Sequence, residues 1–355
     1  MKALSRLAAL LLCLALAGAA SAEGGGDGEW VTFLLLCNEG MLNDGGDVGN
    51  TLMVVSMNAA EGSIRQLMFT WDSFINYPGF EMPQLLDKPF RVGGPEETLK
   101  LFNQNFGQSI DSYLSINFMN LASLIDSFGG VTLDVTRAER NALNGMVASK
   151  KQSALIALKS FMLDETLYNA LFDSFYLNEY GPNTQVSGLQ AVGYGWLQYD
   201  SVANCCLREV EVIADLFRQV GGFVEQRVAF YVDGETPPDG GDGRRPVNLS
   251  QLSGEDREFL YRLVSPIFEK SYNNLTREKI ETVSVAIARA AYDARRMDKN
   301  IFEMIEYQIL PLEHDQPYTT IAGVQGHALD YAANTLAINR FLRNAGESPR
   351  PEEMP

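Results

Sequence analysis

The sequence has few of the residues that build metal centres, with two histidines and four cysteines among 355 residues. His314 and His327 show no spacing to each other or to the cysteines that is typical of a zinc site. Basic residues are also scarce: 28 lysines and arginines stand against 45 acidic residues, a net charge of −17. Such a balance repels phosphate backbones, which argues against nucleic-acid binding and against anionic membrane surfaces.

Long apolar runs are absent after the first 22 residues, so no later stretch approaches the ~20 apolar residues that a spanning helix needs. Residues 1–22 have a basic start (Lys2 and Arg6), an apolar core over Leu7–Ala17 and small residues before position 23. This pattern predicts a secretory signal peptide and an extracytoplasmic protein; an uncleaved signal would instead tether the chain. Without this segment, 26 basic and 45 acidic residues remain, a net charge of −19.

Three cysteines lie beyond the predicted signal: Cys37, Cys205 and Cys206. In an exported protein a disulfide from Cys37 to Cys205 or Cys206 is plausible, leaving one thiol over. Adjacent cysteines rarely bridge each other without strain. Three buried free thiols, as in a reducing niche, are the alternative that the sequence leaves open.

A predicted β-hairpin lies at the centre of the chain. The apolar runs Thr51–Met57 and Ile64–Phe69 flank the turn-forming residues Asn58–Gly62. Asn50 opens the first strand and Asp72 follows the second, so antiparallel pairing brings these polar residues to one edge of the sheet. We expect a site at that edge, although Asp72 can equally begin an ordinary loop.

The rest of the chain predicts an α/β layered domain. Predicted strands and helices alternate over residues 30–37, 95–106, 113–118, 121–128 and 131–135, with further helices over 188–194, 208–220, 274–297 and 328–342 and a strand over 318–321. The domain is expected to span residues 30–343, with inserts near 138–180 and 230–262. Residues 23–29 form a predicted flexible lead-in, and residues 344–355 a disordered tail.

Several segments together resemble the LytR-CpsA-Psr family. The resemblance rests on Val48–Thr51 and Met68–Ser73, on Leu99–Phe106 and Leu124–Val131, and on Gly188–Tyr194 and Asn273–Thr276. It implies a layered α-β-α domain with a central mixed β-sheet flanked by helices. It also implies work at the outer face of a bacterial membrane, where family members transfer a glycopolymer from a polyprenyl-pyrophosphate carrier to peptidoglycan with Mg²⁺. The implied partner is a polyprenyl-linked glycan or a cell-wall glycan.

The sequence departs from the family at the charged positions. The family's "RSDT" arginine and aspartate fall on Val48 and Asn50, and the arginine of its "PRD" element on Trp71, whereas the aspartate survives as Asp72. Two further arginines fall on Trp196 and Gln198. A single cationic group at a transferring phosphate can contribute about 10³ to 10⁵ in rate, so these losses should remove most of the family's activity.

These departures favour a binding protein with phosphotransfer reduced or lost. The predicted pocket residues are Asn50, Trp71, Trp196 and Gln198, where the tryptophans either stack on a ligand or simply fill space. Asp72 and Arg208, the arginine that survives from a later motif, are either a remnant of the catalytic site or a structural ion pair.

Two other readings stay open. One is an active Mg²⁺-dependent phosphotransferase that grips pyrophosphate with Arg65, Arg91 or Arg208. The other is an interaction protein whose pocket is closed.

Overall fold

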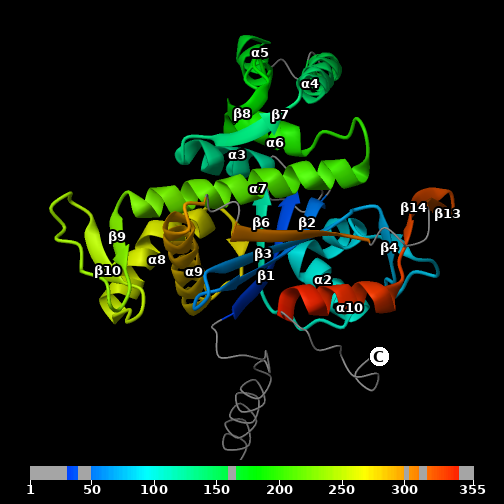
Figure 1. The fold of residues 1–355 in the computed structure, drawn as a ribbon. Helices are drawn as coiled ribbons and strands as arrows, with labels where there is room; N and C mark the ends of the chain where they lie inside the picture. Colours follow the sequence, from blue (N-terminus) through cyan, green and yellow to red (C-terminus); the bar gives the residue numbers. More distant parts are fainter. Residues whose placement is uncertain (1–29, 39–48, 159–164, 300–303, 312–317, 344–355) are drawn as a thin grey trace, which may run out of the picture.

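A six-stranded mixed sheet forms the centre of the computed structural model, which describes residues 30–38, 49–158, 165–299, 304–311 and 318–343 (Figure 1). The strand order is β11-β6-β1-β2-β3-β12. Its strands are β1 (Trp30–Asn38), β2 (Gly49–Asn58), β3 (Ser63–Phe69), β6 (Tyr113–Asn117), β11 (Tyr272–Asn273) and β12 (Ile305–Leu310). The pairs β1/β6 and β3/β12 are parallel, and the pairs β11/β6, β1/β2 and β2/β3 are antiparallel, so the predicted mixed sheet is confirmed.

The predicted central hairpin is confirmed as β2 and β3. Leu52 pairs with Phe69 at one end, and Asn58 pairs with Ser63 at the turn. The Asn58 side-chain carbonyl accepts hydrogen bonds from two backbone N–H groups of the turn, at 2.8 and 2.9 Å. Gly62 closes the turn with φ of 66°, a conformation that glycine adopts without strain. Because the turn lies at the far end, the polar residues that flank the hairpin share the opposite edge.

Helices cover both faces of the sheet, which explains why the central strands read as continuous apolar runs. One face, with Leu35, Met53 and Met68, packs against the core helices α7 and α9; the other, with Leu34 and Phe69, packs against α2 and α10. The helices are α2 (Lys88–Phe106), α3 (Phe118–Ser127), α4 (Arg137–Leu158), α5 (Glu165–Asp173), α6 (Gly188–Gly195), α7 (Val202–Glu225), α8 (Gly254–Glu269), α9 (Arg277–Arg296) and α10 (Tyr331–Arg343). The predicted α-β-α layering is therefore confirmed.

Local capping chemistry sets several helix ends. Thr276 caps α9, and Gly107 ends α2 in the left-handed conformation. Helix α2 begins seven residues before the predicted start and kinks at Gly93 and Gly94. Helix α7 starts at Val202 rather than Arg208 because the Ser201 hydroxyl accepts a hydrogen bond from a first-turn N–H group.

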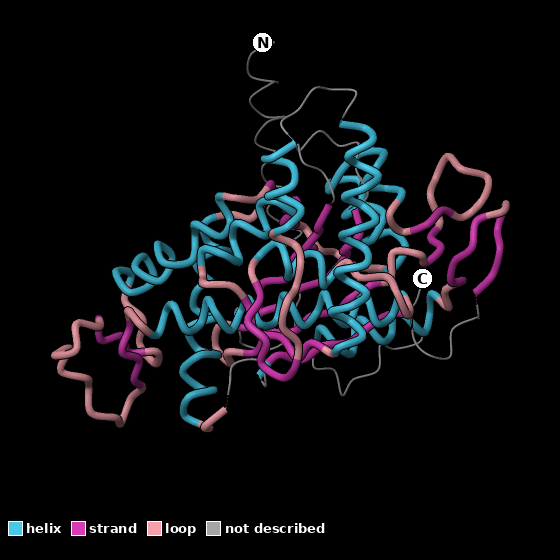
Figure 2. The backbone as a smooth tube through the Cα atoms, turned by 90° about the horizontal axis from the view of Figure 1, so that it is seen from above, coloured by secondary structure: helices cyan, strands magenta, loops and turns pink. Residues whose placement is uncertain are grey.

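Smaller β units lie around the central layers. Strands β7 (Val131–Val135) and β8 (Gly181–Val186) pair with each other, as do β9 (Val228–Tyr231) and β10 (Arg245–Asn248); β4 (Ser73–Ile75), β5 (Gln84–Leu85), β13 (Tyr318–Ile321) and β14 (Val324–Ala328) form another sheet. Figure 2 shows β9–β10 and β13–β14 at opposite ends of the molecule. The first predicted insert contains α4 and α5, which project beyond α6 (Figure 1).

In the part of the chain that the structure describes, no helix is both long and apolar enough to cross a membrane. The predicted signal peptide, lead-in and tail lie outside the described residues.

Candidate functional site

The predicted sheet edge brings together the ends of three strands and two helices. The end of β1 supplies Cys37, which pairs with Thr51 near the start of β2. The chain leaves β3 through Trp71 and Asp72, and the turn between α6 and α7 carries Trp196 to the same edge. The backbone of Asn50 lies in β2 at this edge, and its side chain is outside the described residues.

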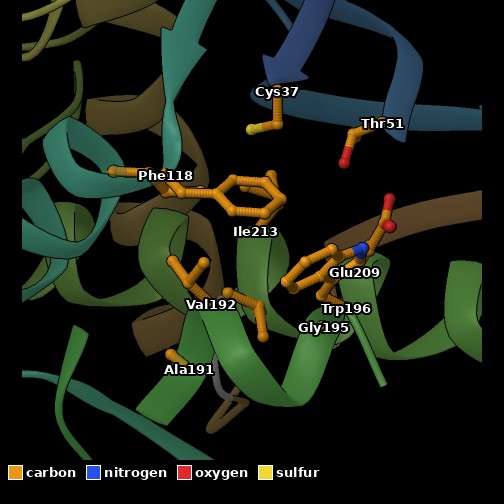
Figure 3. Close-up of a pocket in the computed structure, with 11 residues that line it drawn as sticks. Cys37, Thr51, Phe118, Ala191, Val192, Gly195, Trp196, Glu209 and Ile213 are labelled. Atoms are coloured by element: carbon orange, nitrogen blue, oxygen red, sulfur yellow. The ribbon is translucent and has the colours of Figure 1, made fainter. Parts of the chain in front are cut away.

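An apolar inner cavity lies directly beneath this edge (Figure 3). Its volume is about 30 Å³. Because one water needs ~10–15 Å³, the cavity has room for about two waters. The rings of Phe118 and Trp196 fill much of the surrounding space, with centroids 5.4 Å apart. The tryptophan therefore occupies room that a deeply inserted ligand would need.

Glu209 is the buried polar group of the inner cavity. Burial raises the pKa of its carboxyl from 4.5 to about 8, although hydrogen bonds with Thr51 and Cys205 lower the pKa in part. Its Oε2 atom has no hydrogen-bond partner among the described residues. A neutral carboxylic acid therefore sits behind the sheet edge at physiological pH.

Cys37, Cys205 and Cys206 are buried free thiols in the structure. The disulfide considered from Cys37 to Cys205 or Cys206 is therefore not formed. Cys205 lies 3.3 Å from the carbonyl oxygen of Gly195 and 3.9 Å from Glu209 Oε1. Burial, and then the nearby Glu209 carboxyl, raises the pKa values of the Cys37 and Cys205 thiols. Both effects disfavour the reactive thiolate.

We predict that the chain without residues 1–22 exposes three free thiols when it is denatured under non-reducing conditions. The native protein should react only slowly with an alkylating reagent at pH 8, because the thiols are buried and stay protonated. Mass spectrometry of the alkylated protein measures both states. Recovery of a single thiol from denatured protein would instead identify a disulfide.

A larger, open cleft lies outside the inner cavity, and we call it the aromatic cleft. Its volume is about 360 Å³. Its lining includes the side chains of Trp71, Trp196, Gln198, Tyr199, Arg91 and Lys150. Three of the four predicted pocket residues thus line one cleft, with two cations beside them.

The two cations of the aromatic cleft are each held by a neighbour. Arg91 forms an ion pair with Asp87 at 2.7 Å, one turn earlier in α2. The Lys150 ammonium lies 3.2 Å from the centroid of the Trp196 ring, a cation–π contact. Lys150 comes from the predicted insert, where the sequence pattern gave no sign of a site residue.

Arg208 does not line the aromatic cleft and is held by structural contacts. Its guanidinium pairs with Asp200 at 2.8 Å, lies 3.6 Å from Glu139, and donates to the carbonyl of Leu197. The hydrogen bond from Arg208 holds the pKa of the Asp200 carboxyl well below its usual range. Arg208 therefore fixes the turn between α6 and α7, and it pairs with Asp200 and Glu139 instead of with Asp72.

Asp72 is buried, with 1% of its surface exposed, and its carbonyl accepts a hydrogen bond from the N–H of His327 in β14. Magnesium usually binds proteins through one or two carboxylates together with substrate phosphates. Asp87 is paired with a cation and Glu209 is neutral, while the second carboxylate of the family motif is an amide in Asn50. The described residues also contain no cluster of three or more acidic, histidine or cysteine side chains placed to hold a metal. Asp72 is thus the one carboxylate of the family motif that could hold magnesium here, and then only together with phosphates of a ligand.

Arg65, one of the arginines considered for gripping pyrophosphate, serves another purpose. It lies in β3 six residues before Trp71, which is about 20 Å at ~3.3 Å per residue. Its guanidinium donates to the carbonyls of Phe341 and Leu342 at the end of α10, at 3.0 and 3.2 Å. Arg65 is thus a buried anchor for α10 and takes no part in the site.

The sequence and the fold of this chain are similar to those of known proteins. Residues 27–196 match the LytR_cpsA_psr family model. Over 96 residues the chain is 35% identical to a probable cell wall biosynthesis protein, LcpB, of Corynebacterium glutamicum; the match covers 26% of this chain and 23% of LcpB. Over 100 residues it is 31% identical to the polyisoprenyl-teichoic acid–peptidoglycan teichoic acid transferase TagU of Oceanobacillus iheyensis, covering 26% of this chain and 31% of TagU. The chain thus spans less than a third of these curated relatives.

The fold resembles solved structures over much more of its length. One is TagT, a LytR-CPS2A-psr family protein solved with bound octaprenyl pyrophosphate lipid. The similarity covers 92% of this chain and 93% of TagT, with a TM-score of 0.53 and 13% sequence identity. At this identity the likeness establishes the fold.

Proposed function

This chain belongs to the LytR-CpsA-Psr family of cell-envelope proteins, and we propose that it binds the head of a polyprenyl-linked or cell-wall glycan without transferring it. The proposal takes the ligand class from TagU and TagT, whose names record a polyisoprenyl-linked teichoic acid and a prenyl pyrophosphate. It also includes secretion through the predicted signal peptide, which would bring the chain to the compartment of such ligands.

The observation that carries the proposal is the composition of the aromatic cleft. Two tryptophans, a tyrosine and Gln198 line it with Arg91 and Lys150. Aromatic faces and amides suit a sugar, and two cations suit the phosphates that link it to a lipid. A volume of about 360 Å³ lies within the range of small-molecule sites.

The charges of the site support binding over catalysis. Phosphoryl transfer needs cations aimed at the charge that develops on the transferring group. Here Arg208 is committed to Asp200, and four other arginine positions of the family motifs hold uncharged residues. The family motif offers a metal one carboxylate, Asp72, instead of two, because the other position is the amide Asn50. We therefore expect a rate far below that of an arginine-complete relative.

The small inner cavity bears on how the lipid is held. With room for about two waters, it admits no prenyl chain unless Phe118 and Trp196 move. In our proposal the cleft recognises the polar head, and the prenyl chain stays outside the inner cavity. An interaction protein with a permanently closed pocket is the outcome if no head group binds.

Active transfer is the second candidate, and one observation favours it. Arg91 and Lys150 lie in the same cleft and could together contact two phosphates after the Asp87 pair opens. In that case replacing either cation would abolish product formation. Binding alone requires only that affinity falls.

Binding of a fluorescent polyprenyl-pyrophosphate glycan in detergent micelles tests the proposal. We expect Trp71→Ala to weaken binding at least tenfold, since one aromatic contact contributes about 0.5–1.5 kcal/mol beyond its buried area. Tyr307→Ala is the matched control, because Tyr307 is 52% exposed on β12 and lies outside the cleft. Equal affinity of both variants and the wild type would contradict the proposed site.

A further inference from the structure

A second groove, separate from the aromatic cleft, lies on the loop that follows β4. We call it the loop groove, and its volume is about 550 Å³. Its lining includes the side chains of Asn76, Phe80, Glu81, Met82, Gln104 and Tyr331. None of its lining residues lines the aromatic cleft. Loop 76–83, the end of α2 and the start of α10 together form it.

The loop groove exposes large apolar side chains. Phe80 is 45% exposed and Met82 is 46% exposed, although both sit on a short turn rather than a packed element. The Phe80 ring rests on Tyr77, with centroids 4.9 Å apart. A single exposed apolar residue is ordinary, whereas a group of them in a hollow rimmed by polar groups is typical of a binding site.

The backbone of the loop groove is already ordered. The Asn105 side chain accepts from the N–H of Asn76 and donates to its carbonyl, both at 2.9 Å. The Tyr331 hydroxyl also accepts from the Asn76 N–H, at 3.1 Å, and the Phe80 N–H donates to the carbonyl of Tyr77. Because this turn is fixed in advance, a ligand would bind without the entropic cost of ordering it.

The polar groups of the loop groove are planar amides and a carboxylate. The side chains of Glu81 and Gln104 are exposed and make no hydrogen bond with other described residues. Of the described lining residues, Glu81 alone is charged, and the Lys88 ammonium lies 5.9 Å from the centroid of the Phe80 ring. The groove therefore carries little charge, on a chain whose net charge of −17 repels polyanions.

We propose that the loop groove is a carbohydrate site for a neutral oligosaccharide. The ring of Phe80 would cover the apolar C–H face of one pyranose, while Gln104 and Glu81 would bond the hydroxyls at its rim. A charged glycopolymer lacks matching cations here, and this distinguishes the loop groove from the aromatic cleft. The inference does not depend on the function proposed for that cleft.

Titration of the full chain with chitotetraose and with cellotetraose, followed by calorimetry, tests the inference. We expect at least one of these neutral tetrasaccharides to bind with a Kd below about 1 mM. Phe80→Ala should weaken binding about tenfold, and Gln104→Ala should weaken it severalfold. Affinity that falls with Trp71→Ala and not with Phe80→Ala would place the sugar in the aromatic cleft, so failure of the aromatic cleft and failure of the loop groove are distinguishable.

Two controls make the result decisive. Tyr307→Ala removes from β12 an aromatic residue whose exposed fraction, 52%, is close to the 45% of Phe80. This variant should bind the sugar like the wild type. Melting curves of every variant exclude loss of binding through unfolding. The inference is overturned if neither sugar binds at 5 mM, if Phe80→Ala binds as well as the wild type, or if a proline-rich peptide binds the groove and neither sugar does.

Discussion

Replacing Glu209 with glutamine is expected to stabilise the protein at pH 9 by on the order of 4 kcal/mol and to leave its stability at pH 4 nearly unchanged. The folded protein holds the Glu209 proton up to about pH 8, whereas the unfolded chain releases it near 4.5. Folding therefore takes up a proton when the pH lies between 4.5 and about 8. The corresponding stability is fully present below pH 4.5 and is lost as the pH rises through 8.

The cause is burial rather than repulsion by a neighbouring charge. Glu209 sits in the apolar inner cavity, where Arg208, the nearby cation, is already bonded to Asp200. Glutamine keeps the shape and the acceptor for Thr51 and removes the titration. Urea unfolding at pH 4, 7 and 9 measures the difference between wild type and variant, with exposed Glu61→Gln as the control. Equal pH dependence of wild type and Glu209→Gln would show that the carboxyl titrates normally.

Replacing Arg65 with methionine is expected to destabilise the protein by about 3 kcal/mol. Arg65 is 2% exposed, bonds the last carbonyls of α10, and lies 3.3 Å from Glu306 and 4.7 Å from the centroid of the Trp30 ring. Methionine can fill part of the space but donates nothing to those carbonyls. Leaving a buried acceptor unpaired costs about 1–3 kcal/mol by itself.

The control for this prediction is Arg262→Met. Arg262 is 72% exposed and pairs with Glu258 one turn away at 2.6 Å, so its loss should cost less than about 1 kcal/mol. Urea unfolding at pH 7 compares the two variants. If Arg65→Met is as stable as Arg262→Met, Arg65 does not anchor α10. Retained binding of the lipid-linked glycan by folded Arg65→Met would agree with the position of this residue outside the site.

Local patterns in the sequence were sufficient to predict the central hairpin and the sheet edge of the candidate site, whereas the mixed sheet was predicted from the family resemblance. The apolar runs of β2 and β3 and the turn between them are contiguous in the chain, so pairing needs little long-range information. The caps at Thr276 and Gly107 are also local. Strand β12 and helix α8 were missed.

The site itself depends on contacts that no local pattern carries. Lys150 reaches Trp196 only because α4 folds back over the turn after α6, and Glu209 became notable only once its burial was known. The sequence left Arg208 as either a catalytic remnant or a structural residue, and the deciding fact is its pairing with Asp200 eight residues earlier. One signal was available: Glu209 stands directly beside the surviving arginine in the matched motif.

The most direct test of binding without transfer is to count the phosphates on a retained lipid. Protein lacking the predicted signal is incubated with a radiolabelled polyprenyl-pyrophosphate glycan and a peptidoglycan acceptor, with and without Mg²⁺, and the bound lipid is extracted. We predict that the lipid is recovered with both phosphates and its glycan, at a level that Trp71→Ala lowers and Tyr307→Ala does not. Release of lipid monophosphate with glycan attached to the acceptor would contradict the account and establish an active transferase.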